Sequence, residues 1–398
     1  MRVTQNMMYR SSANALQDKY GKMHEIQEAT LSGRRLNKPS DDPSSAFRDI
    51  VFSSNLSQVK SMQRTMDMAS ERLTMAETHI DIIHEKLVDA ETLAVKFANS
   101  TVNGDPEVMT AASREALTMY EEAFKYATES LDGIPLFGGG RTKTPFDVNN
   151  PTIGSILKRP QEPFGSDLSA QTDMSMQANS LSTTGTGYPG VPASVRVTYN
   201  ATAGDYTVNV NGTDTGTVTP ANNELDMGWV KMDIANTPTD QDAFYFEVFP
   251  DYQGGTADRA IKIGDGRQLP GNVTGEELIE GLEPRGRNIN IFEELSGLRG
   301  AMLRADSDEV AARIDGLQEG RAQASDMQVI TGIRTAQVES IQTTLGYDQA
   351  TLETAKAKNG EVDLFAMISK LEQTNQALQV MTISERTVLD NSILDFIR

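Results

Sequence analysis

The stretch that decides the fold is residues 52–97, FSSNLSQVKSMQRTMDMASERLTMAETHIDIIHEKLVDAETLAVKF. Apolar residues follow one another in it at spacings of three or four, and polar residues fill most places between them. This is the a/d pattern of a helix that lies along another helix for most of its length. A helix of this length, about 70 Å at 1.5 Å per residue, cannot bury its apolar stripe alone. The members of the stripe are Phe52, Leu56, Val59, Met62, Met66, Ala69, Leu73, Ala76, Ile80, Ile83, Leu87, Ala90, Ala94 and Phe97.

The rest of the chain mirrors this arrangement about a strand-like middle. The pattern predicts an amphipathic helix over residues 1–31, then a break, then the long helix. In the second half it predicts a short helix from residue 289, a long helix over residues 307–358 and a last helix over residues 362–397. We therefore expect the 307–358 helix to be the partner of the stripe, and the two terminal helices to pair likewise.

The middle of the chain, residues 138–287, is rich in Gly, Thr, Asn and Pro. Residues 194–199 and 206–210 alternate with period two, and the second run leads into Asn211-Gly212, a strong hairpin signal. Residues 243–249 are apolar nearly throughout, which is typical of a more buried strand. The predicted fold class is therefore α+β and multidomain. Long N- and C-terminal helices pair as a coiled-coil-like rod, with a β-rich domain inserted between them.

This pattern divides the chain into three parts, two of them built from both ends of the sequence. The predicted parts are a terminal helical domain of residues 1–40 and 359–398, a helical rod of residues 41–137 and 288–358, and an inserted β-rich outer domain of residues 138–287.

Composition excludes several classes of function. The net charge of −20 leaves too little positive field for a non-specific nucleic-acid binder. The first forty residues are the exception, with seven Lys and Arg against three acids. The chain has no cysteine, which excludes disulfides and thiolate metal sites. No apolar run is long enough to span a bilayer, and the N-terminus lacks the apolar core of a cleaved signal peptide.

The sequence shows no arrangement of catalytic residues, cofactor ligands or metal ligands. His79 and His84 are five residues apart, about 140° around a helix, so they cannot share a metal. We expect both to be exposed polar positions beside the stripe. Asp41 and Asp42 stand beside Pro43 at a helix start, which favours capping over acid–base chemistry and leaves a contact to a neighbouring subunit as the alternative. The sequence thus predicts a protein that is not an enzyme and has no cofactor.

Both ends of the chain resemble one family. SGRRLNKPSDDP, residues 32–43, is similar to the N-terminal motif shared by bacterial flagellins and flagellar hook-associated proteins. Its two prolines resemble the hook-associated protein 3 family, the hook–filament junction proteins, more than flagellin. ALQ at residues 377–379 and SILDFIR at residues 392–398 resemble that family's C-terminus, with small departures at residues 380–381 and 393. The family motif comprises Ser32, Gly33, Arg35, Pro39, Ser40, Asp41, Asp42 and Pro43.

The resemblance covers residues 1–135 and 288–398, and it implies a structural component of the bacterial flagellum that joins the hook-associated zone to the flagellin filament. It implies type III export without a cleaved signal peptide and an extracellular location. The implied partners are copies of the chain in a helical layer, the preceding hook-associated protein, flagellin, and a cytoplasmic export chaperone at the C-terminal helix. Neither nucleic acid nor a membrane span is implied.

The terminal helices each offer only one narrow apolar stripe. Two such stripes make a thin core that barely offsets the conformational entropy of the ordered residues. We therefore expect these helices to order on packing against neighbouring copies. The candidate assembly residues are Val3, Met7, Leu16, Tyr20, Met23, Leu364, Ile368, Leu371, Leu378, Leu389 and Phe396.

Three alternatives remain open. Flagellin itself is the first, although Pro39, Pro43 and the Leu-Asp-Phe ending argue against it. A coiled-coil signalling or adhesion protein is the second, for which a membrane span or surface anchor would be expected. An enzyme carried on the β-rich domain is the third and has the least support.

Overall fold

A computed structural model describes most of the 398-residue chain. The described residues are 5–35, 38–40, 42–98, 105–154, 156–159, 169–170, 177–234, 238–263, 268–281 and 289–396. Side chains are described throughout these ranges except at residues 5–6, 8–9, 158–159, 169–170, 177–180 and 388–396.

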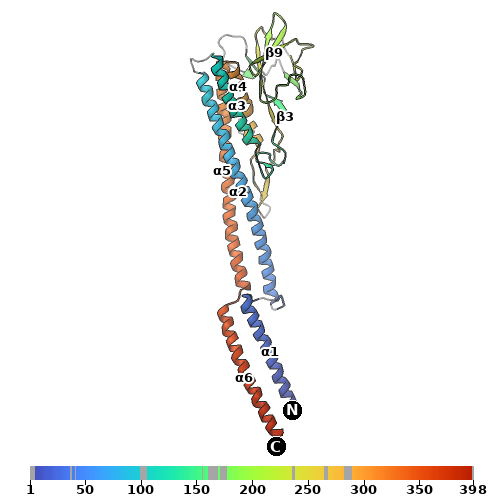
Figure 1. Ribbon diagram of the computed structural model, residues 1–398, viewed down its shortest axis with the longest axis vertical. Helices are drawn as coiled ribbons and strands as arrows, with labels where there is room; N and C mark the ends of the chain where they lie inside the picture. Colours follow the sequence, from blue (N-terminus) through green and yellow to red (C-terminus); the bar gives the residue numbers. More distant parts are fainter. Residues whose placement is uncertain are drawn as a thin grey trace. The chain divides into compact units, whose positions relative to one another are not determined.

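Long helices occupy both ends of the chain and strands occupy its middle, so the predicted fold class is confirmed (Figure 1). The stripe lies on the second helix, which begins at the predicted proline. The helices are α1 (Gln5–Ser32), α2 (Pro43–Ala98), α3 (Pro106–Thr128), α4 (Ile291–Leu303), α5 (Ser307–Gly360) and α6 (Leu364–Phe396), with a five-residue π-helix, η1 (Glu276–Glu280).

Short polar side chains cap the starts of α3, α4 and α5. The Asp105 carboxylate accepts a hydrogen bond from the Glu107 amide at the start of α3, and the Asn290 side chain accepts from the Phe292 amide at the start of α4. The Asp306 carboxylate accepts from the Glu309 amide at the start of α5. Each satisfies a backbone donor that the helix itself leaves unpaired.

Contacts divide the chain into two compact units. The first unit comprises residues 1–64 and 341–398, and the second comprises residues 65–340. Helices α2 and α5 each contribute a part to both units. The three-part division expected from the sequence stays a prediction.

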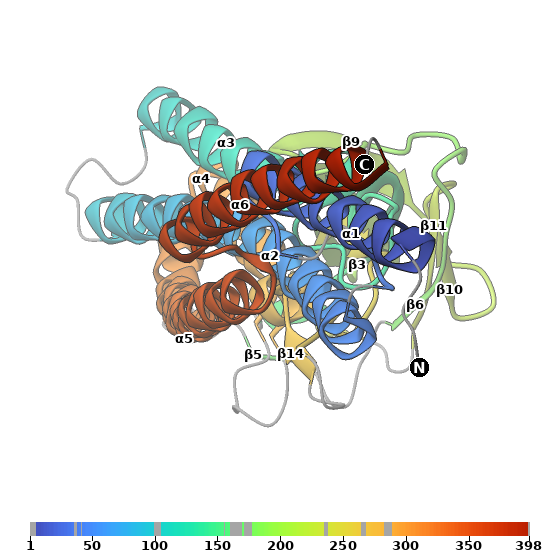
Figure 2. The ribbon, with the colours of Figure 1, turned by 90° about the horizontal axis from the view of Figure 1, so that it is seen from below.

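In the first unit, α1 and α6 lie side by side (Figures 1 and 2). The beginning of α2 and the end of α5 are joined in the same unit by polar contacts. Asn359 Nδ2 donates to the Ser45 carbonyl over 2.8 Å, and Lys60 Nζ lies 3.6 Å from Glu353 Oε1. These pairs show that α2 and α5 run antiparallel here.

In the second unit, the remainder of α2 and α5 also run antiparallel. Gln318 Nε2 donates to Glu91 Oε1 over 3.0 Å, and Gln328 Nε2 donates to Asp81 Oδ1 over 2.9 Å. Helices α3 and α4 pack on each other in this unit. The predicted neighbour of the stripe, the 307–358 helix, is thus observed beside it in both units.

In the described residues of the second unit, the strands form one large sheet and three small ones. The large sheet has the order β5-β4-β12-β7-β8-β9, with β3 also paired to β12, and every pairing in it is antiparallel. Its strands are β3 (Phe146–Ile153), β4 (Leu157–Arg159), β5 (Ser169–Ala170), β7 (Ala193–Asn200), β8 (Asp205–Val210), β9 (Thr213–Val218) and β12 (Ala243–Tyr252).

Along the chain, one small sheet precedes the strands of the large sheet, one falls among them and one follows them. The small sheets comprise β1 (Ser130–Leu131) with β2 (Ile134–Pro135), β6 (Gln177–Leu181) with β10 (Glu224–Asp226) and β11 (Val230–Asp233), and β13 (Ala260–Lys262) with β14 (Gln268–Pro270).

Two of the strand predictions are confirmed in detail. Asn211 and Gly212, both with positive φ, form the tight turn between β8 and β9. The 243–249 run lies in β12, which is buried from Ala243 to Pro250 and pairs with β7 and β3. Helix α4 packs against β12 and β7, and it therefore links the sheet to the helices of this unit.

The stripe on α2 changes in burial along its length. From Met66 to Phe97 its members are buried, all within the second unit. Phe52, Leu56, Val59 and Met62, which belong to the first unit, are only half-buried.

The prediction that His79 is an exposed polar position is wrong. His79 is buried, with its ring edge-on to Tyr126 of α3 at a centroid distance of 5.1 Å. Helix α3 covers this side of α2, and the sequence of α2 alone carries no sign of that. His84 is half-buried.

Candidate assembly surface

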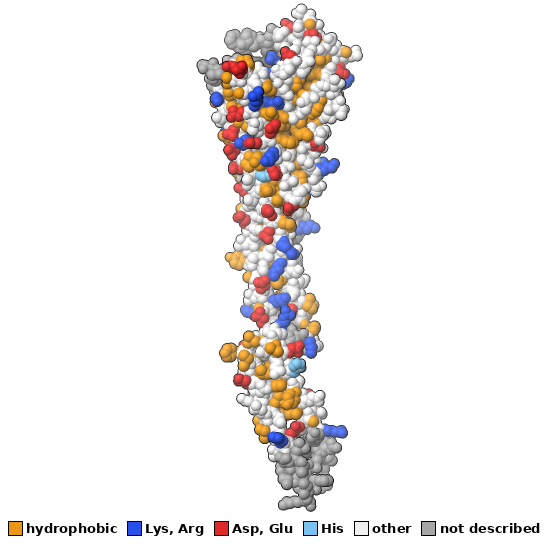
Figure 3. Space-filling model, viewed as in Figure 1, with side chains coloured by type: hydrophobic (Ala, Val, Ile, Leu, Met, Phe, Trp, Pro, Cys, Tyr) orange, Lys and Arg blue, Asp and Glu red, His pale blue; other side chains and the backbone are white. Residues whose placement is uncertain are grey.

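Large apolar side chains are exposed over the first unit. Phe365 and Leu31 are the extremes, with 90% and 89% of their surface exposed. Figure 3 shows hydrophobic side chains on the surface over α1 and α6. We call this set the apolar surface; it comprises Met7, Tyr20, Leu31, Phe47, Ile50, Val51, Tyr347, Leu364, Phe365, Ile368, Val380 and Ile383.

The core between α1 and α6 is thin. Among the described side chains of these two helices, the buried apolar ones are Ile26, Ala29 and Leu378. Ordering one residue costs about 1–2 kcal/mol of backbone entropy, and isolated helices owe most of their stability to tertiary packing. Two helices of 28 and 33 residues with so few buried side chains gain little from each other.

The predicted assembly residues divide between the surface and the core of this helix pair. Met7, Tyr20, Leu364 and Ile368 are exposed, whereas Leu378 is buried between the helices. Leu16, Met23 and Leu371 are half-buried. Val3 and the side chains of Leu389 and Phe396 lie outside the described parts of the chain.

Sequence reasoning missed eight members of the apolar surface: Leu31, Phe47, Ile50, Val51, Tyr347, Phe365, Val380 and Ile383. Phe47, Ile50 and Phe365 illustrate why. The first two lie in the opening turns of α2, outside the 52–97 stripe. The signal that could have revealed them is that Phe47 and Ile50 are apolar although they do not belong to the a/d stripe of the same helix. Phe365 stands next to a predicted residue, Leu364, and had no signal of its own.

The residues of the 32–43 motif tie together three chain segments. Gly33, with φ +65°, ends α1 in the left-handed conformation that glycine adopts without strain. The Gly33 carbonyl accepts from the Val362 amide over 3.2 Å, and the Arg35 amide donates to the Gly360 carbonyl over 2.8 Å. The motif thus fastens the end of α1 to the end of α5.

The motif also holds the start of α2. Asp42 is its N-cap: Oδ1 accepts from the Ser45 amide over 3.2 Å, and Oδ2 accepts from Ser45 Oγ over 2.6 Å. Arg35 Nη2 donates to Ser45 Oγ and to the Asn359 carbonyl, both over 3.0 Å. We call Arg35, Asp42, Ser45 and Asn359 the junction cluster.

The charges of the junction cluster support its geometry. Hydrogen bonds from Ser45 hold the pKa of Asp42 below its ordinary value, and Arg35, 3.6 Å away, adds to the effect. Capping of α2 by Asp42 is therefore what the structure shows. Pro39 and Ser40 are exposed, and Asp41 lies outside the described residues.

A second polar cluster is buried in the second unit. Glu247 of β12 accepts from Ser194 Oγ of β7 and from Ser296 Oγ of α4, each over 2.9 Å, and Arg313 Nη2 of α5 lies 3.5 Å from it. Arg304 binds Ser194 and Glu309, so the cluster joins the sheet to both helices.

Burial raises the pKa of Glu247 to about 7, against the opposing effect of Arg313. Sequence reasoning did not single out this cluster. A charged residue inside an apolar strand was the available signal, because a buried glutamate needs a partner.

The described residues give no support to a catalytic or metal site. Among them, no three His, Asp or Glu side chains gather as metal ligands would. A search of their helices also finds none with the length and apolarity that a bilayer crossing requires.

Comparison with known proteins places the N-terminal part of the chain. Residues 3–139 match the family of the bacterial flagellin N-terminal helical region. The chain is 22% identical over 148 residues to flagellar hook-associated protein 3 of Salmonella typhimurium, and 23% identical over 145 residues to the Escherichia coli protein of the same name. These matches cover 37% and 36% of this chain, and 46% and 45% of the relatives, so the chain spans about half the length of the curated relatives it matches.

Solved structures of similar description also align with the chain. A putative flagellar hook-associated protein from Vibrio parahaemolyticus aligns with a TM-score of 0.48 at 12% identity, over 81% of this chain and all of that one. FlgL from Bacillus cereus aligns with a TM-score of 0.44 at 15% identity, over 77% of this chain and 99% of that one.

The chain therefore carries a flagellin-type N-terminal helical region at residues 3–139. Within that class, its curated relatives are named flagellar hook-associated protein 3. The match over residues 3–139 includes the 32–43 motif and confirms its resemblance, while the resemblance at the C-terminus stays a prediction.

Proposed function

We propose that the chain is a structural component of the bacterial flagellum that joins the hook-associated zone to the flagellin filament. The observation that carries the proposal is the apolar surface on the first unit, where α1 and α6 expose more apolar side chains than they bury between them. The names of the curated relatives supply the context.

The apolar surface explains why the chain would assemble. Removing apolar surface from water contributes roughly 25 cal/mol per Å², and the α1–α6 pair gains little of this by itself. Packing of several copies would bury the same side chains and complete the core. The terminal helices would then order as they assemble, with residues 1–40 and 359–398 as the inner tube.

The remaining partners follow from the same proposal. The helical layer would contact the preceding hook-associated protein on one side and flagellin on the other. An export chaperone would cover the C-terminal helix before assembly, because its exposed apolar residues, such as Val380 and Ile383, would otherwise promote premature association. The chain would act outside the cell as a structural protein of the flagellum, not as an enzyme.

Flagellin is the second candidate, favoured by the match of residues 3–139 to the flagellin N-terminal helical region. The two candidates share an assembly surface and differ in location and copy number. The number of copies of the chain in one flagellum, and their location, therefore distinguish the two candidates.

The test is to locate and count the chain in flagella with an epitope in the loop between β8 and β9, where Asn211 and Gly212 form the turn. A few copies confined to the hook–filament boundary are expected. Label along the whole filament would replace the junction proposal by the flagellin alternative. Absence of label from flagella that assemble normally would overturn both.

A further inference from the structure

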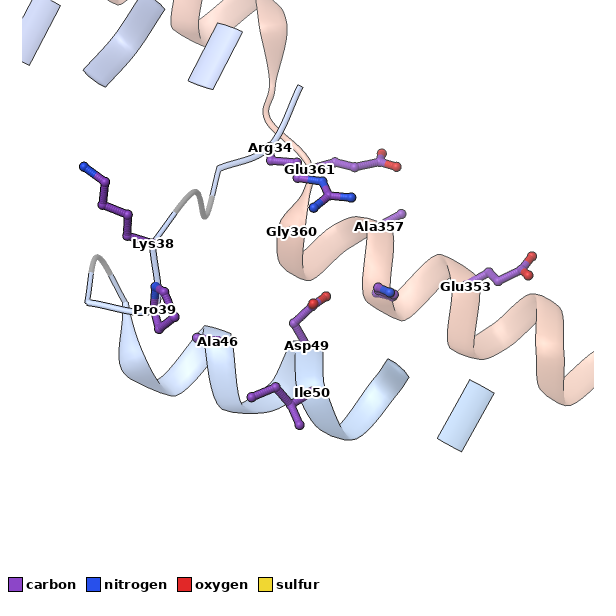
Figure 4. A pocket seen from close by; sticks show the side chains of 11 residues that line it. Arg34, Lys38, Pro39, Ala46, Asp49, Ile50, Glu353, Ala357, Gly360 and Glu361 are labelled. Atoms are coloured by element: carbon purple, nitrogen blue, oxygen red, sulfur yellow. The ribbon is translucent and has the colours of Figure 1, made fainter. Parts of the chain in front are cut away.

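A hollow of about 450 Å³ opens in the first unit beside the junction cluster (Figure 4). Ala46 and Ile50 of α2 form one wall, and Ala357 and Gly360 of α5 form the other. The hydrogen bonds from Asn359 to Ser45 and from Arg35 to Asn359 hold these two walls together. The hollow is thus preformed, and an occupant need not order the walls.

The lining determines which chemistry the hollow accepts. Its walls are small and apolar, while charged side chains of both signs stand around it in equal number: Arg34, Lys38, Lys356, Asp49, Glu353 and Glu361. An ionic occupant would therefore gain no net attraction and would lose hydration against the apolar walls. An uncharged apolar side chain fits both features.

Phe365 is the apolar side chain that the same unit presents most openly, at 90% exposure. It stands in the first turn of α6, which is capped by the hydrogen bond from the Ala366 amide to Asp363 Oδ1 over 3.1 Å. Its exposure shows that it does not fill the hollow of its own chain. Leu364 and Ile368 extend the apolar strip beside it.

We propose that the hollow receives Phe365 of a neighbouring copy of this chain. The inference rests on the proposed self-assembly and gives it a specific contact. The ring and the hollow occupy different places on the same unit, so the contact is heterologous and repeats from copy to copy.

The natural absence of cysteine allows a direct test between copies. Two single-cysteine chains, Phe365→Cys and Ala46→Cys, are mixed under assembling conditions, with an added mass tag on one of them, and oxidised briefly. We expect the mixed disulfide dimer to form several-fold more than in a matched mixture of Leu31→Cys with Ala46→Cys. Leu31 is the control because it belongs to the same unit and is as exposed as Phe365.

The yield of the mixed disulfide dimer is compared with the degree of assembly of the same samples, measured by sedimentation. If the chains assemble but the Phe365 and Leu31 mixtures cross-link equally, the contact is overturned while the proposed function stands. If the natural chain does not assemble with itself or with flagellar partners, the contact and the proposed function are both overturned.

A second pair of variants avoids oxidation. Phe365→Ala removes the ring, and Ala46→Leu fills the hollow with a good helix former. Each should raise the concentration for half-assembly about tenfold, which corresponds to 1.4 kcal/mol, whereas Leu31→Ala should change it less. Unchanged assembly in both Phe365→Ala and Ala46→Leu would overturn the contact.

Discussion

Asp42 shows at the residue scale how one side chain can fix the start of a 56-residue helix. Asp42→Ala removes the acceptor of the Ser45 amide, so amide exchange in the first turn of α2 should become faster. Asp42→Asn keeps a capping oxygen and should have a smaller effect. Equal exchange rates in the natural chain and Asp42→Ala would contradict the capping role.

The same residue predicts a response to acid. Its pKa is lower in the folded chain than the ordinary value of about 3.9. The contribution of its carboxylate is therefore fully present above pH 4 and is lost as the pH falls further. The protection factor of the Ser45 amide, which compares its exchange rate with that of the unfolded chain at the same pH, should fall below pH 4 in the natural chain and less so in Asp42→Asn.

Glu247 predicts a pH dependence of stability opposite in sign to that of Asp42. Burial raises its pKa to about 7, so its contribution is fully present below about pH 4 and is lost as the pH rises through 7. Glu247→Gln cannot ionise, and its free energy of unfolding should rise relative to the natural chain across this range, by on the order of 3 kcal/mol. Denaturant unfolding of both chains at several pH values measures this.

Glu280 provides the control for that measurement. Burial raises its pKa to about 7 as well, and nearby Asp251 adds to the effect. The free energy of unfolding of Glu247→Gln should therefore still depend on pH because Glu280 still titrates. Glu280→Gln should remove that remaining dependence. A pH profile of Glu247→Gln that coincides with that of the natural chain would show that Glu247 does not titrate here.

Residue-level prediction succeeded where the cause is local. The cap at Asp42 and the turn at Asn211-Gly212 follow from residue types within a few positions. The partners of Glu247 are Ser194, Ser296 and Arg313, which stand 53, 49 and 66 residues away. No local pattern contains that information, and the same is true of the contact between His79 and Tyr126.

At the scale of elements, two glycines of α4 show how helix and sheet approach each other. A Cβ on Gly300 would collide with Ser194 Oγ, and one on Gly297 would collide with the guanidinium of Arg313. These glycines therefore make room for the cluster around Glu247, at some cost in helix propensity.

This arrangement predicts opposite effects for two similar substitutions. Gly300→Ala should destabilise the second unit by about 1–3 kcal/mol because the added methyl overpacks the interface. Gly332→Ala on α5 meets nothing within 4 Å and should stabilise by about 1 kcal/mol. Thermal or denaturant unfolding measures both, and stabilisation by Gly300→Ala would contradict the described packing.

Helix α6 allows the surface to be separated from the core. Val380 and Ile383 are exposed, whereas Leu378 is buried against α1. Val380→Asp combined with Ile383→Asp should leave the helix content of the monomer unchanged and weaken assembly. Leu378→Asp should weaken assembly as well, and it should also lower the helix content of the assembled chain because it removes part of the thin core between α1 and α6. Circular dichroism and sedimentation distinguish these outcomes, and full assembly of the exposed double variant would contradict the role of this face.

Helices were more predictable than the sheet for a physical reason. The stripe on α2 repeats over 46 residues, so its period and its need for a partner helix are visible in the sequence. The order of strands about β12 depends on pairings with β3, β4 and β7 across long connections. Alternation indicates that strands exist, and it does not say which strand lies beside which.

For the whole molecule, the two units differ in how completely they bury their apolar residues. The second unit encloses its part of the stripe and the aromatic residues of β12. The first leaves the stripe from Phe52 to Met62 half-buried and exposes the apolar surface. That difference is the basis for proposing that the first unit is completed by neighbouring copies.

Amide hydrogen exchange, followed in a verified monomer and in the assembled state, tests this claim most directly. We predict little protection over α1 and α6 in the monomer, strong protection over α3, α4 and β12, and a large gain over α1 and α6 on assembly. Strong protection of α1 and α6 in the monomer, with no gain on assembly, would contradict the account.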